Sequence, residues 1–192
     1  MEPDAEQWVQ KQAVSFLRRI GIEANQTVLD FGCHHGNYTK PAAQIVGPDG
    51  KVYALDKDRE VLTDLQNQVA ESDLNNIEFL HVSEEDPIPL SISTVDMILL
   101  YDVVHRGYAP EPEQRARTLE EVHRVLKPDG RLSFYPTHLK KYGMTFRKQL
   151  REVRNAGFDL LGESKRKLVH DGRLVRGRIF TCSKKVAGRG SR

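Results

Sequence analysis

A run of small and polar residues follows a short apolar segment near the N-terminus. The stretch Val28–Thr39 reads VLDFGCHHGNYT, with Asp30 ahead of glycines at positions 32 and 36. Glycine lets a chain turn tightly and lets a ligand approach the backbone, and the amide groups that open a following helix favour an anionic group. The spacing G-C-H-H-G differs from the dinucleotide fingerprint G-x-G-x-x-G, and Asp30 would repel a pyrophosphate. The pattern therefore predicts a ligand-binding turn for a different ligand.

A second acidic residue ends the next apolar segment. Asp56 closes the run VYALD, directly after the predicted strand Lys51–Leu55. A carboxylate at the end of a second strand can accept hydrogen bonds from both hydroxyls of a ribose. Each feature alone also fits an ordinary connection between a strand and a helix. Together, in one strand–helix–strand unit, they favour an adenosine-type ligand.

Histidines that follow predicted strands are candidates for proton transfer. His34 and His35 follow the first strand, His105 the fourth and His138 the fifth. Imidazole titrates near neutral pH, so each could take a proton from a hydroxyl or an amine. We rank His105 first, then Tyr101 and His138; the alternative is that these side chains have no catalytic role. Because no close ligand spacing such as C-x-x-C is present, we predict no metal site.

Alternating strands and helices must position these residues. Hydrophobic spacing predicts helices over 5–20, 39–46, 59–71, 113–126 and 145–156, and strands over 27–31, 51–55, 77–82, 95–101, 131–135, 158–165 and 173–183. This alternation indicates an α/β fold with a doubly wound, mostly parallel sheet, to which the closing pair adds one antiparallel strand. Ligands bind at the carboxyl ends of strands in such sheets. We therefore expect the site within segments 30–39, 56–58, 82–87, 101–109 and 135–142.

The chain resembles the small, single-domain class I S-adenosylmethionine-dependent methyltransferases. The motifs that carry the resemblance are VLDFGCHHGNYT, VYALDKD, HVSEEDPIPL, VDMILLYDVVH and LEEVHRVLKPDGRLSFY, and it covers about residues 5–183. It implies a Rossmann-like sheet of seven strands, with one antiparallel strand near the C-terminal edge. It also implies one domain over residues 1–183, with a basic tail over 184–192 that we expect to be disordered. The cofactor would be S-adenosyl-L-methionine.

The resemblance also assigns roles to individual residues. The cofactor would be surrounded by Asp30, Gly32, Cys33 and Gly36 at its methionine half, Asp56 and Lys57 at its ribose, and Ser83 and Glu84 at its adenine. Tyr101 and Asp102 would face the sulfonium and the acceptor. The family has glycine in the middle of the turn, where this chain has His34, and a side chain there can crowd the cofactor and strain the backbone. We expect His34 to point away and the cofactor to bind.

Charge is divided unevenly along the chain. The net charge is +2, but residues 1–130 hold 23 acidic and 12 basic side chains, whereas residues 131–192 hold 4 and 17. Basic residues at 165–167, 173, 176 and 178 flank the predicted connection of the last two strands, on the rim of the site. They would attract an anionic acceptor; a solvated basic surface is the alternative. Nucleic acid is not favoured, because aromatic interleaving is poor and no Asn-Pro-Pro-Tyr motif follows the fourth strand.

Length and composition exclude several other classes of protein. Two distant cysteines and the lack of an apolar run of about 18–20 residues argue against a disulfide framework and a membrane span. The acidic N-terminus is unlike a signal peptide, so we predict a cytoplasmic protein. The leading hypothesis is an enzyme that methylates an oxygen or nitrogen of a small acceptor. The alternatives are a non-catalytic cofactor-binding or interaction protein, in which His34 blocks productive binding, and an RNA-directed methyltransferase.

Overall fold

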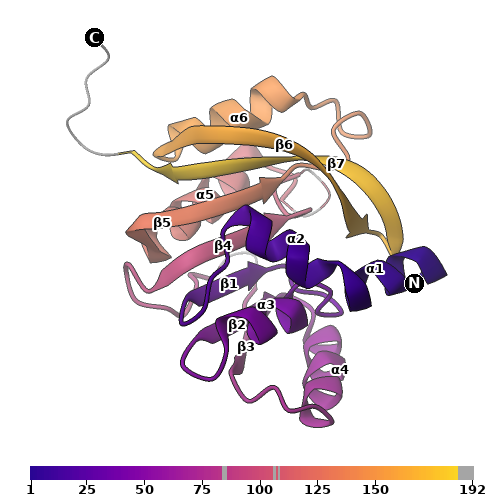
Figure 1. Cartoon of the computed structure of the whole chain (residues 1–192). Helices are drawn as coiled ribbons and strands as arrows, with labels where there is room; N and C mark the ends of the chain where they lie inside the picture. The colour runs from indigo at the N-terminus through magenta and orange to yellow at the C-terminus, as the bar shows by residue number, and fades with distance from the viewer. Residues whose placement is uncertain (84–85, 106, 108, 186–192) are drawn as a thin grey trace.

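Seven strands form one sheet in the computed structural model, which describes residues 1–83, 86–105, 107 and 109–185 (Figure 1). The strands are β1 (Thr27–Phe31), β2 (Lys51–Asp56), β3 (Ile77–His81), β4 (Val95–Tyr101), β5 (Leu126–Tyr135), β6 (Phe158–His170) and β7 (Arg173–Lys184). They lie in the order β3-β2-β1-β4-β5-β7-β6. Strand β7 is antiparallel to both neighbours, while the other pairs are parallel. The predicted fold is confirmed.

Helices cover both faces of this sheet. They are α1 (Pro3–Lys11), α2 (Ala13–Ile20), α3 (Thr39–Val46), α4 (Arg59–Ala70), α5 (Pro112–Val125) and α6 (Phe146–Asn155). Because side chains alternate along a strand, Val28 of β1 packs with α1–α3, whereas its neighbour Leu29 packs with α5 and α6. The central strand β4 is buried on both faces in the same way, with Met97 on one side and Ile98 on the other. Such covered strands explain the continuous apolar runs in the sequence.

Three elements differ from the prediction. The segment predicted as one helix over 5–20 is two helices, because the backbone leaves the helical region at Gln12. Strand β5 starts at Leu126 and not at 131, since Leu126 pairs with Val95 across an irregularity in the ladder. Strand β6 continues to His170, so Lys165–Lys167 lie within a strand and not in a loop. A run of basic residues concealed the alternation of exposed and half-buried positions there.

The direction of the strands brings distant segments to one edge. Strand β6 is antiparallel to β7, which is antiparallel to β5, so β5 and β6 point the same way. The end of β6 and the turn at Asp171-Gly172 therefore lie at the edge where β4 and β5 also end (Figure 1). Of the tail predicted over 184–192, residues 186–192 lie outside the described residues. No helix in the described part of the chain combines the length and apolar character needed to cross a membrane.

Candidate functional site

A cavity of about 610 Å³ opens at the carboxyl edge of the sheet. Its walls come from the turn after β1, the ends of β2 and β4, and the turn between β6 and β7. The predicted site residues on these walls are Asp30, Gly32, Cys33, His34, Asp56, Lys57, Tyr101 and Asp102. A volume of this size lies within the range of about 300–1,000 Å³ that is common for small-molecule sites. The structure thus brings most of the predicted residues together around one space.

The Asp30–Thr39 turn, which joins β1 to α3, depends on its two glycines. Gly32 and Gly36 have φ values of +81° and +74°, in the left-handed region that other residues rarely adopt. A Cβ atom on Gly32 would lie 2.7 Å from Cγ2 of Val103, and one on Gly36 would collide with Leu65. Gly36 does not line the cavity; its missing side chain lets the turn pack against Leu65 of α4.

Two carboxylates stabilise this turn in different ways. Asp30 is buried and accepts a hydrogen bond of 2.6 Å from the Thr39 hydroxyl, while burial raises the pKa of Asp30 to about 7. Asp56 accepts hydrogen bonds from the backbone N–H groups of His34, at 2.9 Å, and Asp58, at 3.1 Å. Asp56 thus connects the end of β2 to the turn while it also lines the cavity.

His34 adopts the backbone conformation that glycine would supply. Its φ is +45°, which is strained for a residue with a Cβ atom. His34 is exposed and lines the cavity, and its ring packs edge-on against His35 with 4.0 Å between ring centroids. The hydrogen bond from the His34 N–H to Asp56 holds this strained conformation in place.

Two other predicted residues are buried and engaged with the protein. The Tyr101 hydroxyl shares a hydrogen bond of 2.7 Å with Ser133, and burial raises the pKa of Tyr101 above its ordinary value. Burial also raises the pKa of the Cys33 thiol, with the carboxylates of Asp30 and Asp56 adding to the effect. Cys33 therefore stays protonated, which makes it a poor nucleophile and a poor metal ligand.

Asp102, which follows β4, is the centre of a polar network. The hydroxyl of Thr137 donates to its carboxylate, and Nε2 of His105 lies 3.2 Å from its Oδ1. Although burial opposes the effect, these hydrogen bonds lower the pKa of Asp102 below its ordinary value. Nδ1 of His105 accepts the N–H of Gly107 at 2.9 Å, and the ring stacks on Tyr142. These contacts place the Nε2 proton of His105 toward Asp102.

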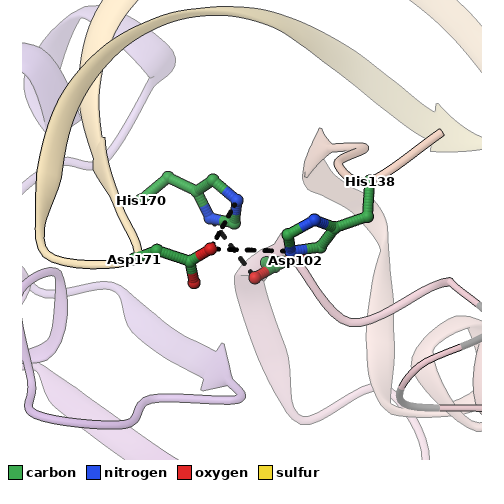
Figure 2. Close-up of side chains that lie close together, drawn as sticks. All are labelled: Asp102, His138, His170 and Asp171. Atoms are coloured by element: carbon green, nitrogen blue, oxygen red, sulfur yellow. Dashed lines mark ion pairs between the residues drawn. The ribbon is translucent and has the colours of Figure 1, made fainter. Parts of the chain in front are cut away.

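Two histidines and a second aspartate complete the network (Figure 2). We call Asp102, His138, His170 and Asp171 the histidine–aspartate cluster. Nε2 of His138 lies 3.4 Å from Oδ1 of Asp102 and 3.8 Å from Oδ2 of Asp171. His170 places Nδ1 3.3 Å from Oδ2 of Asp102 and Nε2 3.5 Å from Oδ2 of Asp171.

The sequence prediction missed His170 and Asp171. Both were available as polar residues at the predicted Asp171-Gly172 turn. The predicted strand ends at residue 165, five residues before the observed end of β6 at His170. The prediction therefore did not place His170 and Asp171 at the carboxyl edge of the sheet. The correct strand length would have placed both residues at the edge of the sheet.

The predicted adenine contact Ser83 and the basic side chains of β6 and β7 do not line the large cavity. Ser83 lines a smaller cavity of about 230 Å³ together with Phe31, Leu55 and Val82, while Glu84 lies outside the described residues. Of the basic side chains on β6 and β7, Arg178 pairs with Glu163 at 2.7 Å. Among the described residues that line the large cavity, the lysine next to Asp56 is the single lysine or arginine.

Comparisons with known proteins place this geometry in context. The model of a family described as "Methyltransferase domain" matches residues 28–130. A solved structure described as a SAM-dependent methyltransferase from Aquifex aeolicus superposes with a TM-score of 0.72 and 25% identity, covering 94% of this chain and 93% of the other.

Curated relatives match only part of their own length. The arsenite methyltransferase of Halobacterium salinarum is 35% identical over 108 residues, which is 56% of this chain and 26% of the relative. A demethylmenaquinone methyltransferase of Geobacillus stearothermophilus is 30% identical over 114 residues, 59% of this chain and 46% of the relative. The chain thus spans between about a quarter and a half of the length of these relatives.

Proposed function

We propose that this chain, which belongs to the methyltransferase domain family, transfers the methyl group of S-adenosylmethionine to an oxygen or nitrogen nucleophile of a small molecule. The observation that carries the proposal is the single cavity shared by the Asp30–Thr39 turn and Asp102. One end of that cavity has the residues expected for the cofactor. The other end has polar side chains that can hold an acceptor.

The residues of the turn fit this cofactor. Buried Asp30 is a carboxyl group for which a cationic ligand would be a favourable partner, because its pKa near 7 makes ionisation easy to induce. Each oxygen of Asp56 accepts one backbone hydrogen bond and retains a lone pair for a ribose hydroxyl. Gly32 lines the cavity, and its missing side chain makes room for Val103 beside the turn. Ser83 and the apolar side chains of the smaller cavity would receive the adenine.

The protein would contribute alignment and a fixed polar environment to the transfer. When bound, the cofactor supplies the electrophilic methyl group on its sulfonium. Asp102 lies on the cavity wall, where its carboxylate can orient an acceptor hydroxyl or amine. Of the three predicted catalytic residues, we propose that His105 and His138 position Asp102 and that the engaged hydroxyl of Tyr101 shapes the wall.

The charges on the cavity wall bear on the charge of the acceptor. The described lining holds a single lysine, Lys57, against five aspartates: Asp30, Asp56, Asp58, Asp102 and Asp171. Basic side chains on β6 and β7 provide a long-range attraction for an anion instead of a direct contact. We propose that an acceptor with a neutral nucleophile and an anionic group elsewhere suits this distribution best.

Cofactor binding is the first test of the proposed function. Isothermal titration calorimetry of the full chain with S-adenosylmethionine should give one site, and Asp56→Ala should weaken it about 10–100-fold through the loss of charge-assisted hydrogen bonds. Glu78→Ala is the control, because Glu78 pairs with Lys51 on the exposed surface of β3 and β2. Lack of binding at millimolar cofactor would overturn the proposal.

The strained His34 favours one second candidate, a protein that binds the cofactor without turnover. Formation of S-adenosylhomocysteine can be followed with a panel of neutral and anionic alcohols and amines. Turnover that appears only in His34→Gly supports the non-catalytic protein. Turnover by the native chain rejects it.

A further inference from the structure

The histidine–aspartate cluster combines side chains from three separate parts of the chain. Asp102 follows β4, His138 follows β5, and His170 with Asp171 ends β6 and opens the turn to β7. Each offers one nitrogen or oxygen atom, and these atoms all lie within 4.8 Å of one another. Figure 2 shows His170 beside Asp171 and His138 beside Asp102, with the side chains of the two pairs pointing toward one another. Two imidazoles and two carboxylates form a ligand set that suits a divalent transition metal.

The spacing of these atoms fits a metal better than a set of direct hydrogen bonds. Only one nitrogen of His170 can bind a given ion, and with Nε2 in that role the recorded nitrogen–oxygen separations are 3.4, 3.5 and 3.8 Å. Hydrogen bonds from N–H to oxygen are usually about 2.7–3.2 Å long. In a tetrahedral site with bonds of about 2.0–2.2 Å, neighbouring ligand atoms are about 3.3–3.6 Å apart. Two of these separations fall in that range and the third is slightly longer, so the side chains stand close to the positions that a shared central ion would set.

The backbone around the cluster is arranged to aim these side chains. Asp102, His138 and Asp171 have φ values of +58°, +51° and +48°. They are three of the six non-glycine residues in the described part of the chain with positive φ. Such a conformation is unfavourable for a residue with a Cβ atom and is typically found where a function requires it.

A second layer of contacts orients the first carboxylate. Thr137 and His105 both reach Oδ1 of Asp102, and Gly107 fixes the ring of His105 from its other side. Hydrogen bonds of this kind orient ligands in metal sites and tune their affinity. His105 would thus be a positioning residue for the ligand and would not touch the metal.

We propose that the histidine–aspartate cluster binds one divalent transition metal ion, with Zn²⁺ as the reference ion. Asp102, His170 and Asp171 line the large cavity, so the ion would border the space for the acceptor. It would supply a positive charge at a wall that is rich in carboxylates and so could hold an anionic group of the acceptor. This role rests on the proposed methyl transfer, whereas metal binding itself does not.

Direct titration tests the site without any cofactor or acceptor. Tag-free full-length chain, freed of metal with a chelator, is titrated with ZnCl₂ by calorimetry against a competing chelator. We expect one Zn²⁺ per chain with a Kd in the micromolar range or tighter. A Kd weaker than about 1 mM, or no binding at all, overturns the proposal, because about 1 mM is taken as the limit of useful affinity.

Variants separate the cluster from other histidines. The double variant His138→Ala/His170→Ala should bind at least about 100-fold more weakly, and His105→Ala about 10–100-fold more weakly. His81→Ala is the matched control, because His81 lies exposed at the end of β3 and should leave the affinity unchanged. Equal affinities of the double variant and the native chain would place the ion elsewhere and overturn the proposal.

Two further measurements keep the test decisive. Asp171→Asn preserves folding in case the double variant does not fold, because Asp171 is 65% exposed and asparagine tolerates positive φ. We expect it to weaken Zn²⁺ binding about 10-fold.

Cobalt titration should give the strong visible bands of a tetrahedral Co²⁺ site, whereas an octahedral spectrum counts against the cluster. S-adenosylmethionine is titrated separately, so failure of either proposal is recognised on its own.

Discussion

The Asp30–Thr39 turn lines the same cavity as three of the four residues of the histidine–aspartate cluster, but the two regions are built differently. The turn is one continuous stretch, held by buried Asp30 and by two glycines that no larger residue can replace without strain. The cluster is collected from the ends of three strands and stays partly open to solvent, with side-chain exposures of 16% for His170 and 25% for His138. The turn therefore belongs to the folding core, whereas the cluster is added to its edge. Changes in the turn should affect stability, and changes in the cluster should affect ligands.

The largest expected effect comes from Asp30. Its pKa is raised from an ordinary 3.8 to about 7, so the unfolded chain ionises first as pH rises. The free energy of unfolding should fall between about pH 4 and pH 7 by up to about 4 kcal/mol through this group. Asp30→Asn, whose amide oxygen can still accept the Thr39 hydrogen bond, should remove that loss and stabilise the chain above pH 7.

Denaturation with urea at several pH values measures this effect. The two proteins should have similar stability near pH 4 and diverge toward pH 8; parallel curves would show that Asp30 ionises normally. Cationic cofactor should also bind the native chain more tightly as pH rises through about 7, with release of a proton. Calorimetry in buffers of different ionisation enthalpy detects that proton.

The second effect concerns Gly36. Gly36→Ala should lower the free energy of unfolding by about 2–3 kcal/mol, because a Cβ atom at φ +74° is strained and would also collide with Leu65. Gly143→Ala is the matched control, since Gly143 has φ +63° but no neighbouring atom within 4 Å of the added carbon. Urea denaturation should show a loss of about 1 kcal/mol for the control. Equal losses of stability in the two variants would show that the collision with Leu65 adds nothing to the backbone strain.

The third effect tests the strain at His34. His34→Gly should stabilise the chain by about 1 kcal/mol, because glycine adopts φ +45° without a steric cost. The adjacent His35→Gly should give no gain, as His35 is not among the described residues with positive φ. Thermal unfolding compares the two variants. A gain of stability in both variants would show that removal of an exposed imidazole ring, and not relief of backbone strain, causes the effect.

The smallest effect is expected in the cluster. With a chelator present, His138→Ala and His170→Ala should each change the free energy of unfolding by no more than about 1 kcal/mol, as is usual for partly exposed polar side chains. The affinity for S-adenosylmethionine should change less than about two-fold, because neither histidine is among the residues assigned to the cofactor. A two-fold change corresponds to about 0.4 kcal/mol, since 1.4 kcal/mol is ten-fold. A large loss of stability would make the cluster part of the folding core and end the contrast with the turn.

The sequence predicted the sheet and the cofactor end of the site because both depend on local patterns. Strands β1 and β4 and helix α3 have the predicted bounds, since apolar runs and glycines mark their ends. The turn could be interpreted because Asp30, Gly32 and Gly36 are neighbours in sequence. The roles assigned to individual cofactor-binding residues stay predictions until binding is measured.

The cluster could not be predicted for a physical reason. Its members are separated by more than 30 residues at each step from Asp102 to His138 to His170, and only the pairing of β6 with β7 brings the last of them to the site. Spacing rules for metal ligands assume neighbours on one turn or loop and so do not apply here. The run Lys165–Lys167 added to the error, because charged residues concealed an edge strand.

A single phenol connects the two regions. The hydroxyl of Tyr38, at the start of α3, donates to the carbonyl of Val169 at 2.7 Å and accepts the Val169 N–H at 3.0 Å. Val169 directly precedes His170 on the outermost strand of the sheet. The hairpin tip that carries half of the cluster is thus anchored to the helix that follows the turn. If this anchor lets a ligand at the turn change the affinity of the cluster for its own ligand, thermodynamic linkage fixes the reverse effect. The ligand at the cluster must then change the affinity of the turn by the same factor.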